Sequence, residues 1–178
     1  MKRLIWSAAV AAMGLAGCSS APVVLNYAPS STMTVKGGEQ VGTFDYVPAH
    51  AGKIKPNQIR NTAIGNVLLD KNVDKYFEQA LFTESRFVGI TVNAGGPKVH
   101  GAINDFLIDD LGYSIDWTLN VTYIVDGQGG TDCYKQTKAT KMHTAKFANP
   151  FGTLNEVMKQ NIEALFTDSA FVSCIRSA

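Results

Sequence analysis

The stretch KVHGAINDFLIDDLGYSIDWTLNVTYIV, residues 98–125, decides the fold of this chain. In its second half, apolar and polar side chains alternate strictly. The apolar members are Ile115, Trp117, Leu119, Val121, Tyr123 and Val125, and the polar members are Asp116, Thr118, Asn120 and Thr122. Alternation with a period of two is typical of a strand that has one buried and one wet face. The segment therefore predicts an antiparallel sheet that is covered on one side only.

Neighbouring segments supply the other strands of this sheet. Residues 98–108, 113–125 and 131–143 are predicted as three successive strands, and the connections DDLGY and DGQGG carry the Asp and Gly expected in hairpin loops. Upstream, QVGTFDYVPA (residues 40–49) has the β-branched and aromatic content of a fourth strand. Residues 52–61 are polar, contain a proline and are predicted as loop.

Two amphipathic helices flank the three strands. Residues 68–90 carry apolar side chains at helical spacing, with Asp70 as the expected N-cap and Gly89 ending the helix. A second helix follows residues 149–150, where Thr153 and Glu156 match the capping-box spacing. Asp168 is expected to cap a final short turn.

These elements predict an α+β domain. Its sheet is antiparallel-rich and has about four strands, and the two helices pack on one face. The order along the chain is strand, helix, strand, strand, strand, helix.

The first twenty residues have the pattern of a secretory signal. Lys2 and Arg3 precede a short apolar run, which is too short to span a membrane and ends in Leu15-Ala16-Gly17 before Cys18. This ending is similar to the lipobox of bacterial lipoproteins. The resemblance implies a signal peptide over residues 1–17 and lipid attachment at Cys18. The alternative is an ordinary cleaved signal with an incidental cysteine.

The same resemblance suggests where the chain resides. Ser19 and Ser20 stand where an aspartate would retain a lipoprotein in the inner membrane, so the bacterial outer membrane is favoured, with the domain on its periplasmic face. Residues 18–38, rich in Ser, Pro and Gly, are predicted to be the lipidated N-terminus and tether. Residues 39–178 are predicted to form a single periplasmic domain.

Two cysteines remain if Cys18 carries lipid. Cys133 and Cys174 are an even number in a compartment where thiols are oxidised, which predicts a disulfide between them. Two free buried thiols and a metal-binding pair are the alternatives. The metal is disfavoured because the two cysteines have no histidine or aspartate clustered near them in the sequence.

No catalytic motif is found in the sequence. His50, His100 and His143 are far apart, and structural or surface roles are preferred for them. The densest acidic cluster lies beside a hairpin loop, where carboxylates commonly accept backbone hydrogen bonds. Acid–base chemistry or calcium binding is the less favoured interpretation of this cluster. Its members are Asp109, Asp110 and Asp116.

Composition narrows the possible partners. The chain has 16 basic and 15 acidic side chains and no basic run, which argues against a nucleic-acid partner. No metal, cofactor or catalytic residue is predicted, and the chain is not expected to be an enzyme.

Taken together, four features resemble the YajG-like family of bacterial lipoproteins. They are the lipobox, the run RFVGI (86–90), the segment KVHGAINDFLIDDLGYSIDWTLNVTY (98–123) and the closing helix LFTDSAFVSCI (165–175). That family is poorly characterised, so the resemblance implies a fold and a location rather than an activity. The order of elements also resembles lipopolysaccharide-assembly lipoproteins and the auxiliary lipoproteins of lipid transporters, at the level of topology alone.

The expected function is therefore a non-catalytic structural or protein-interaction role in the cell envelope, with an envelope protein as partner and the membrane contacted through the lipid. The alternative is an accessory role in lipid or lipopolysaccharide transport or assembly. This alternative requires the apolar face of the sheet to open as a groove.

Overall fold

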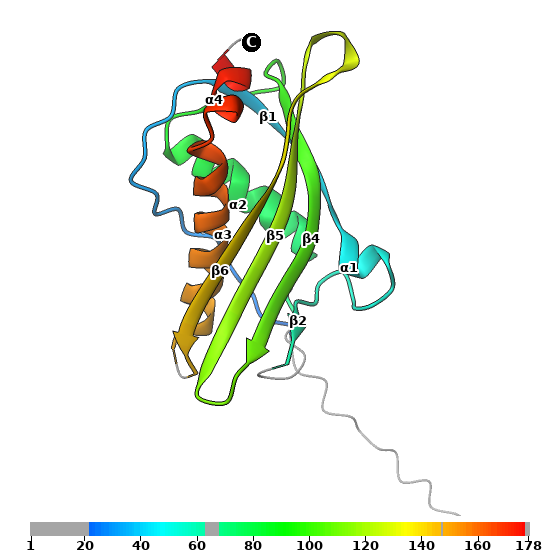
Figure 1. Ribbon diagram of the computed structural model, residues 1–178, viewed down its shortest axis with the longest axis vertical. Coiled ribbons are helices and arrows are strands. Elements are labelled where there is room, and N and C mark those ends of the chain that lie inside the picture. Colours follow the sequence, from blue (N-terminus) through cyan, green and yellow to red (C-terminus); the bar gives the residue numbers. More distant parts are fainter. Residues whose placement is uncertain (1–21, 63–67, 147, 177–178) are drawn as a thin grey trace, which may run out of the picture.

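A curved, mixed sheet of six strands forms one layer of the molecule, and helices form the other (Figure 1). The structure is a computed structural model and describes residues 22–62, 68–146 and 148–176. The strands are β1 (Gly38–Tyr46), β2 (Arg60–Asn61), β3 (Thr91–Val92), β4 (Lys98–Asp110), β5 (Ser114–Asp126) and β6 (Asp132–Ala145). The helices are α1 (Val47–His50), α2 (Val73–Phe87), α3 (Pro150–Phe166) and α4 (Ser169–Arg176), with a short 3-10 turn at Gln128–Gly130.

The strand order is β3-β1-β4-β5-β6, with β2 paired to β4. The pairs β4–β5 and β5–β6 are antiparallel, as predicted. The prediction of about four strands was incomplete, because β2 and β3 add two short strands that run parallel to β4 and β1. Strand β1 also runs parallel to β4, because the chain passes from one to the other through helix α2 rather than through a hairpin. The sheet is therefore mixed.

The alternation in β5 separates the two faces as predicted. Its apolar side chains, Trp117 and Tyr123 among them, are buried, while Asp116, Thr118 and Asn120 stay partly exposed. Strand β4 carries a bulge between Ile103 and Asp105, where the register against β5 shifts. A bulge bends its strand and increases the local twist, which fits the curvature of the sheet.

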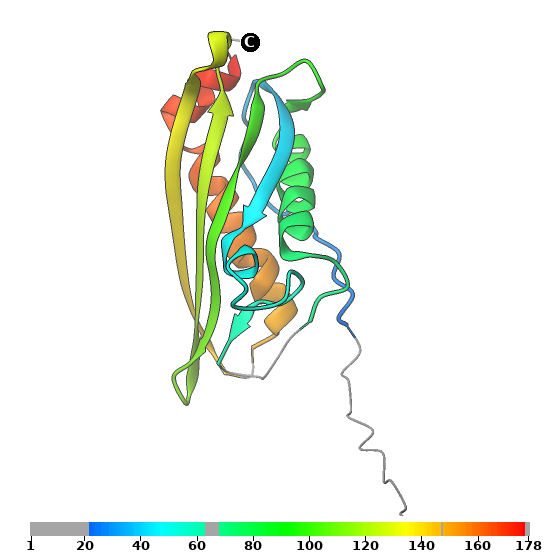
Figure 2. The same cartoon turned by 90° about the vertical axis from the view of Figure 1, so that its right-hand side faces the viewer.

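Helices α2 and α3 cover one face of the sheet, which we call the inner face (Figure 2). Helix α2 packs on β1 and β3, and α3 packs on β5 and β6. The aromatic rings of Phe44, Phe77 and Tyr123 meet between the layers, with Phe44 edge-on to the other two at 5.1 and 5.8 Å between centroids. Each such buried aromatic pair is worth about 1 kcal/mol beyond the area it buries.

Both main helices begin elsewhere than predicted. The N-cap of α2 is Asn72 and not Asp70, whose backbone N–H instead donates to the Val23 carbonyl. The N-cap of α3 is Asn149 and not Thr153: its Oδ1 accepts from the backbone of the next two residues after Pro150, at 3.1 and 3.2 Å. Proline at the first helical position fixes this start, so Thr153 lies one turn inside the helix. The cap predicted at Asp168 is confirmed by its 2.9 Å bond from the Ala170 N–H.

The segment before β1 runs extended against the helical layer (Figure 1). Leu25, Tyr27 and Val35 are buried in the same core as the sheet and helices. The part of the tether that the structure describes therefore contributes to the packing of the domain.

No helix in the described part of the chain is both long and apolar enough to cross a membrane. Cys18 and the predicted signal peptide lie outside the described residues.

Candidate interaction surface

The side of the sheet that faces away from α2 and α3 is polar, and we call it the outer face. A hydrogen-bonded row crosses three strands: the Asn104 side-chain amide donates to Thr122 Oγ1 at 2.8 Å, and the Thr122 and Thr137 hydroxyls lie 2.8 Å apart. Among the helices that the structure describes, none covers this face over β5 and β6 (Figure 2). The row holds its side chains in fixed positions on an open surface.

Histidine–aspartate contacts border the outer face. The His143 Nδ1 lies 2.6 Å from Asp116 Oδ1, and the His100 Nε2 lies 2.8 Å from Asp126 Oδ1. The two aspartates are ten residues apart along β5, which is about 33 Å at the rise of a strand. The third histidine, His50, pairs with an aspartate of β1 from helix α1. Each of the three histidines therefore has its own aspartate partner, and the fold does not bring the three together.

A shallow depression of about 280 Å³ lies beside the His143–Asp116 pair. Thr118 and Lys141 complete its polar lining. The depression belongs to the outer face and makes that surface uneven at one end.

Strand β6 forms an edge of the sheet and is 14 residues long. Lys135, Lys138 and Lys141 lie on this strand, and lysines on an edge strand protect it against unwanted strand pairing. Lys135 and Lys141 are exposed. Lys138 instead turns toward the helical layer, where its Nζ lies 2.6 Å from Asp168 Oδ2. Two of the three lysines are thus exposed on this edge strand.

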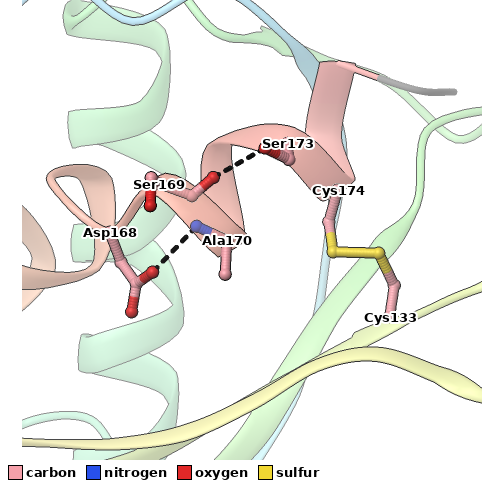
Figure 3. The surroundings of a disulfide bond; sticks show 6 residues. All are labelled: Cys133, Asp168, Ser169, Ala170, Ser173 and Cys174. Atoms are coloured by element: carbon pink, nitrogen blue, oxygen red, sulfur yellow. Dashed lines mark hydrogen bonds between the residues drawn. A yellow bond between two sulfur atoms is a disulfide. The ribbon is translucent and has the colours of Figure 1, made fainter.

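The predicted disulfide between Cys133 and Cys174 is present (Figure 3). It joins the start of β6 to helix α4 across a sequence separation of 41 residues, with the two Cα atoms 6.0 Å apart. The alternatives of free thiols or a metal-binding pair are thereby excluded. Closing a loop of this length stabilises the fold by about 4 kcal/mol on the chain-entropy model.

A polar junction lies beside the disulfide, where α3 gives way to α4. Asp168 accepts from Lys138 Nζ and from the Tyr134 hydroxyl, at 2.6 and 2.9 Å. The Lys138 ammonium is the main reason that the pKa of Asp168 falls to about 2. Burial, together with the bond to Asp168, raises the pKa of Tyr134. The junction and the disulfide together hold α4 against the end of β6.

The acidic cluster found in the sequence is divided among separate partners. Asp110 accepts the Gly112 backbone N–H and the Lys146 Nζ, both at 2.7 Å, and the bond from Lys146 is the main cause of its lowered pKa. Asp109 accepts the Thr62 hydroxyl at 2.5 Å. The predicted role of a hairpin carboxylate as a backbone acceptor is confirmed for Asp110. Within residues 22–62, 68–146 and 148–176, no group of three or more His, Cys, Asp or Glu is placed to hold a metal ion.

Two buried carboxyl groups were not identified as a feature from the sequence. Glu39, at the start of β1, accepts the Ser85 hydroxyl at 2.5 Å, and burial raises its pKa to about 7. Its second oxygen, Oε2, is buried without a hydrogen-bond partner. Glu84, the residue that precedes Ser85 in α2, accepts the Tyr27 hydroxyl at 2.6 Å and the Ser30 N–H at 3.1 Å. The visible signal was Glu84, the one charged residue at an apolar position of the predicted helix.

A buried asparagine connects α3 to the sheet. Asn161 Nδ2 lies 3.1 Å from the carbonyls of Leu119 and Lys138 and 3.0 Å from Thr140 Oγ1. Its Oδ1 accepts the Tyr123 hydroxyl at 2.7 Å. These contacts fix how α3 lies across β5 and β6, so the apolar face of the sheet is filled with specific contacts.

Comparison with known proteins supplies a fold and no activity. No protein-family model matches the chain, and no curated protein matches it. One solved structure, described as an uncharacterized protein, is 10% identical with a TM-score of 0.43 over 82% of this chain and 94% of its own. Another, protein XCC0632 from Xanthomonas campestris, of the DUF330 family, is 11% identical with a TM-score of 0.55. This likeness covers 88% of the present chain and 95% of that one.

These comparisons do not find the YajG-like family that the sequence resembles, so that assignment stays a prediction. At 11% identity, the likeness to XCC0632 concerns the fold alone. The chain therefore has an α+β fold shared with a bacterial protein of the uncharacterised DUF330 family.

Proposed function

We propose that this chain is a lipid-anchored envelope protein that binds a protein partner and does no catalysis. Cys18 carries the anchor, and the domain faces the periplasm from the outer membrane. The partner binds the outer face and the β6 edge. The observation that carries the proposal is the open outer face, ordered by the row from Asn104 to Thr137 and bounded by a long edge strand.

The chemistry of the surface indicates what kind of partner fits. Thr122, Thr137 and Ala139 form a row of small or short side chains, with Lys135 and Lys141 at either side on β6. A partner with a polar surface and a few carboxylates would meet hydroxyls and ammonium groups there. Such charge complementarity mainly affects specificity and the rate of association.

The packing of the inner face favours a protein-binding role over a role in lipid transport. A groove for lipid would require α2 and α3 to leave apolar surface open, yet both helices pack on the sheet. The apolar hollow near the start of α3 has a volume of about 20 Å³. Pockets for small molecules typically measure several hundred Å³. The alternative of an accessory role in lipid or lipopolysaccharide transport would therefore depend on a partner that supplies the lipid path.

Photo-crosslinking from a single position tests the proposal. A photo-reactive amino acid at Ala139, which is exposed on the outer face opposite Asn120, is compared with the same group at Gln79, exposed on α2. We expect a discrete protein adduct from position 139 in intact cells and none from position 79. Equal, diffuse labelling from both positions would contradict a partner on the outer face.

Two further variants test the partner-binding outer face and the lipid anchor separately. Thr137→Arg, in protein that carries the photo-reactive group at position 139, places a long cation beside that group on the outer face, and it should abolish the adduct while the protein remains folded. Cys18→Ala should release the protein from the membrane fraction. If the protein stays membrane-bound without Cys18, the lipid anchor is wrong even where the partner is real.

A further inference from the structure

Large hydrophobic side chains are exposed at one end of the domain. Tyr113 is 98% exposed and Leu111 is 54% exposed, and the two flank Gly112 at the tip of the hairpin between β4 and β5. Val24, near the start of the described chain, and Phe151, at the start of α3, are also exposed. Exposed apolar groups that gather at one end indicate a contact surface.

Contacts within the structure place these residues at the same end. Leu25 and Phe151 line one apolar hollow together with Ile108 and Trp117. Ile108 and Trp117 are register partners, and the hairpin tip begins three residues beyond Ile108. Figures 1 and 2 both show the hairpin and the beginning of the blue segment at the lower end of the molecule. The chain thus enters the domain at the end that carries the exposed hairpin.

The position of the anchor then orients the molecule. Cys18 precedes Pro22, the first described residue, by four positions, which span at most about 14 Å when fully extended. A lipid on Cys18 therefore keeps this end of the domain close to the bilayer surface.

We propose that the Leu111-Gly112-Tyr113 tip enters the interfacial layer of the bilayer and orients the domain on the membrane. This inference rests on the lipid anchor of the proposed function. Tyrosine, with an apolar ring and a polar hydroxyl, suits the boundary between headgroups and acyl chains.

The charges behind the tip are compatible with this contact. Asp110 is paired with Lys146 at 2.7 Å, and Asp109 accepts the Thr62 hydroxyl. The carboxylate nearest the tip is thus neutralised, which weakens its repulsion by anionic lipid headgroups. The outer face runs along the strands away from this end, so a domain standing on its tip leaves that face accessible to a partner.

The test uses the full lipidated protein in vesicles of phosphatidylethanolamine and phosphatidylglycerol. Leu111→Cys and Phe87→Cys are each labelled with an environment-sensitive fluorophore, and quenching by nitroxide-bearing lipids is measured. Both native side chains are exposed to nearly the same degree, 54% and 55%. Phe87 ends α2 four residues before β3, which pairs with the first residues of β1, and β1 pairs with Lys98 at the start of β4. Leu111 follows the end of β4, a strand about 43 Å long. Phe87 therefore serves as a matched control at the opposite end.

We expect several-fold stronger quenching at Leu111 than at Phe87. Equal quenching at both positions, in protein whose lipid on Cys18 is confirmed by mass spectrometry, would overturn the orientation and leave the anchor intact. Mass spectrometry that finds no lipid on Cys18 would overturn both. The label at Leu111 can also be shielded from water in native outer membranes but not in lipid vesicles that contain no other protein. That result would overturn the inference and indicate a protein contact at the tip.

Discussion

Replacing Glu39 with glutamine should change how the stability of this protein depends on pH. Glu39 is fully buried and its pKa is raised from 4.5 to about 7, chiefly because burial disfavours the charged form. Below pH 4.5 the carboxyl is protonated in both the folded and the unfolded chain. Between pH 4.5 and 7 the unfolded chain releases this proton while the folded chain keeps it, so the free energy of unfolding falls as pH rises.

The size of the effect follows from the two pKa values. They differ by 2.5, and each unit of pKa difference corresponds to about 1.4 kcal/mol, so the loss reaches about 3 kcal/mol above pH 7. Glu39→Gln cannot ionise and keeps an acceptor for the Ser85 hydroxyl. Its amide nitrogen would occupy the place of the unpartnered Oε2, at a cost of about 1–3 kcal/mol that does not vary with pH.

Urea unfolding of both proteins across this pH range is the assay. The stability of Glu39→Gln relative to the native protein should rise by about 3 kcal/mol from pH 4.5 to about pH 8. Ser85→Ala removes the hydrogen bond that lowers the Glu39 pKa. In that variant the fall in the free energy of unfolding should therefore extend to higher pH than in the native protein. A difference between native and Glu39→Gln that stays constant with pH would refute the reasoning, because it would mean that the buried carboxyl does not titrate in this range.

Three further substitutions probe the contacts that hold α3 and α4 to the sheet. Replacing Cys133 and Cys174 together by serine should lower the free energy of unfolding by about 4 kcal/mol, and a reductant should then affect the native protein but not the variant. Asn161→Leu leaves the Tyr123 hydroxyl buried without its acceptor and should cost about 2–3 kcal/mol by urea unfolding, part of which Tyr123→Phe should restore in the double variant. Asp168→Asn should cost about 1–2 kcal/mol at neutral pH. Because the Asp168 pKa is lowered to about 2, that cost should disappear as the pH falls from 3.8 to 2, and a cost that persists at pH 2 would contradict the ion pair.

The polar outer face could be predicted only in part from the sequence. The alternation in residues 113–125 identified the wet side of β5, because that pattern is local and has the period of a strand. The bulge at residues 103–105 and the row from Asn104 to Thr137 could not be predicted, because they depend on the register between three strands. The same holds for the histidines: their spacing in sequence does not reveal that each one meets a different aspartate.

Local patterns in the sequence determined the four long strands, the two main helices and the cap at Asp168. The cysteine count favoured the bond between Cys133 and Cys174. The tertiary structure alone decided the parallel pairing of β1 with β4, the start of α2 at Asn72, and the burial of Glu39. Each of these depends on a partner distant in the chain: β4 for β1, the Val23 carbonyl that binds Asp70, and Ser85 for Glu39. Periodicity describes which side of an element is apolar, whereas packing decides which element covers that side.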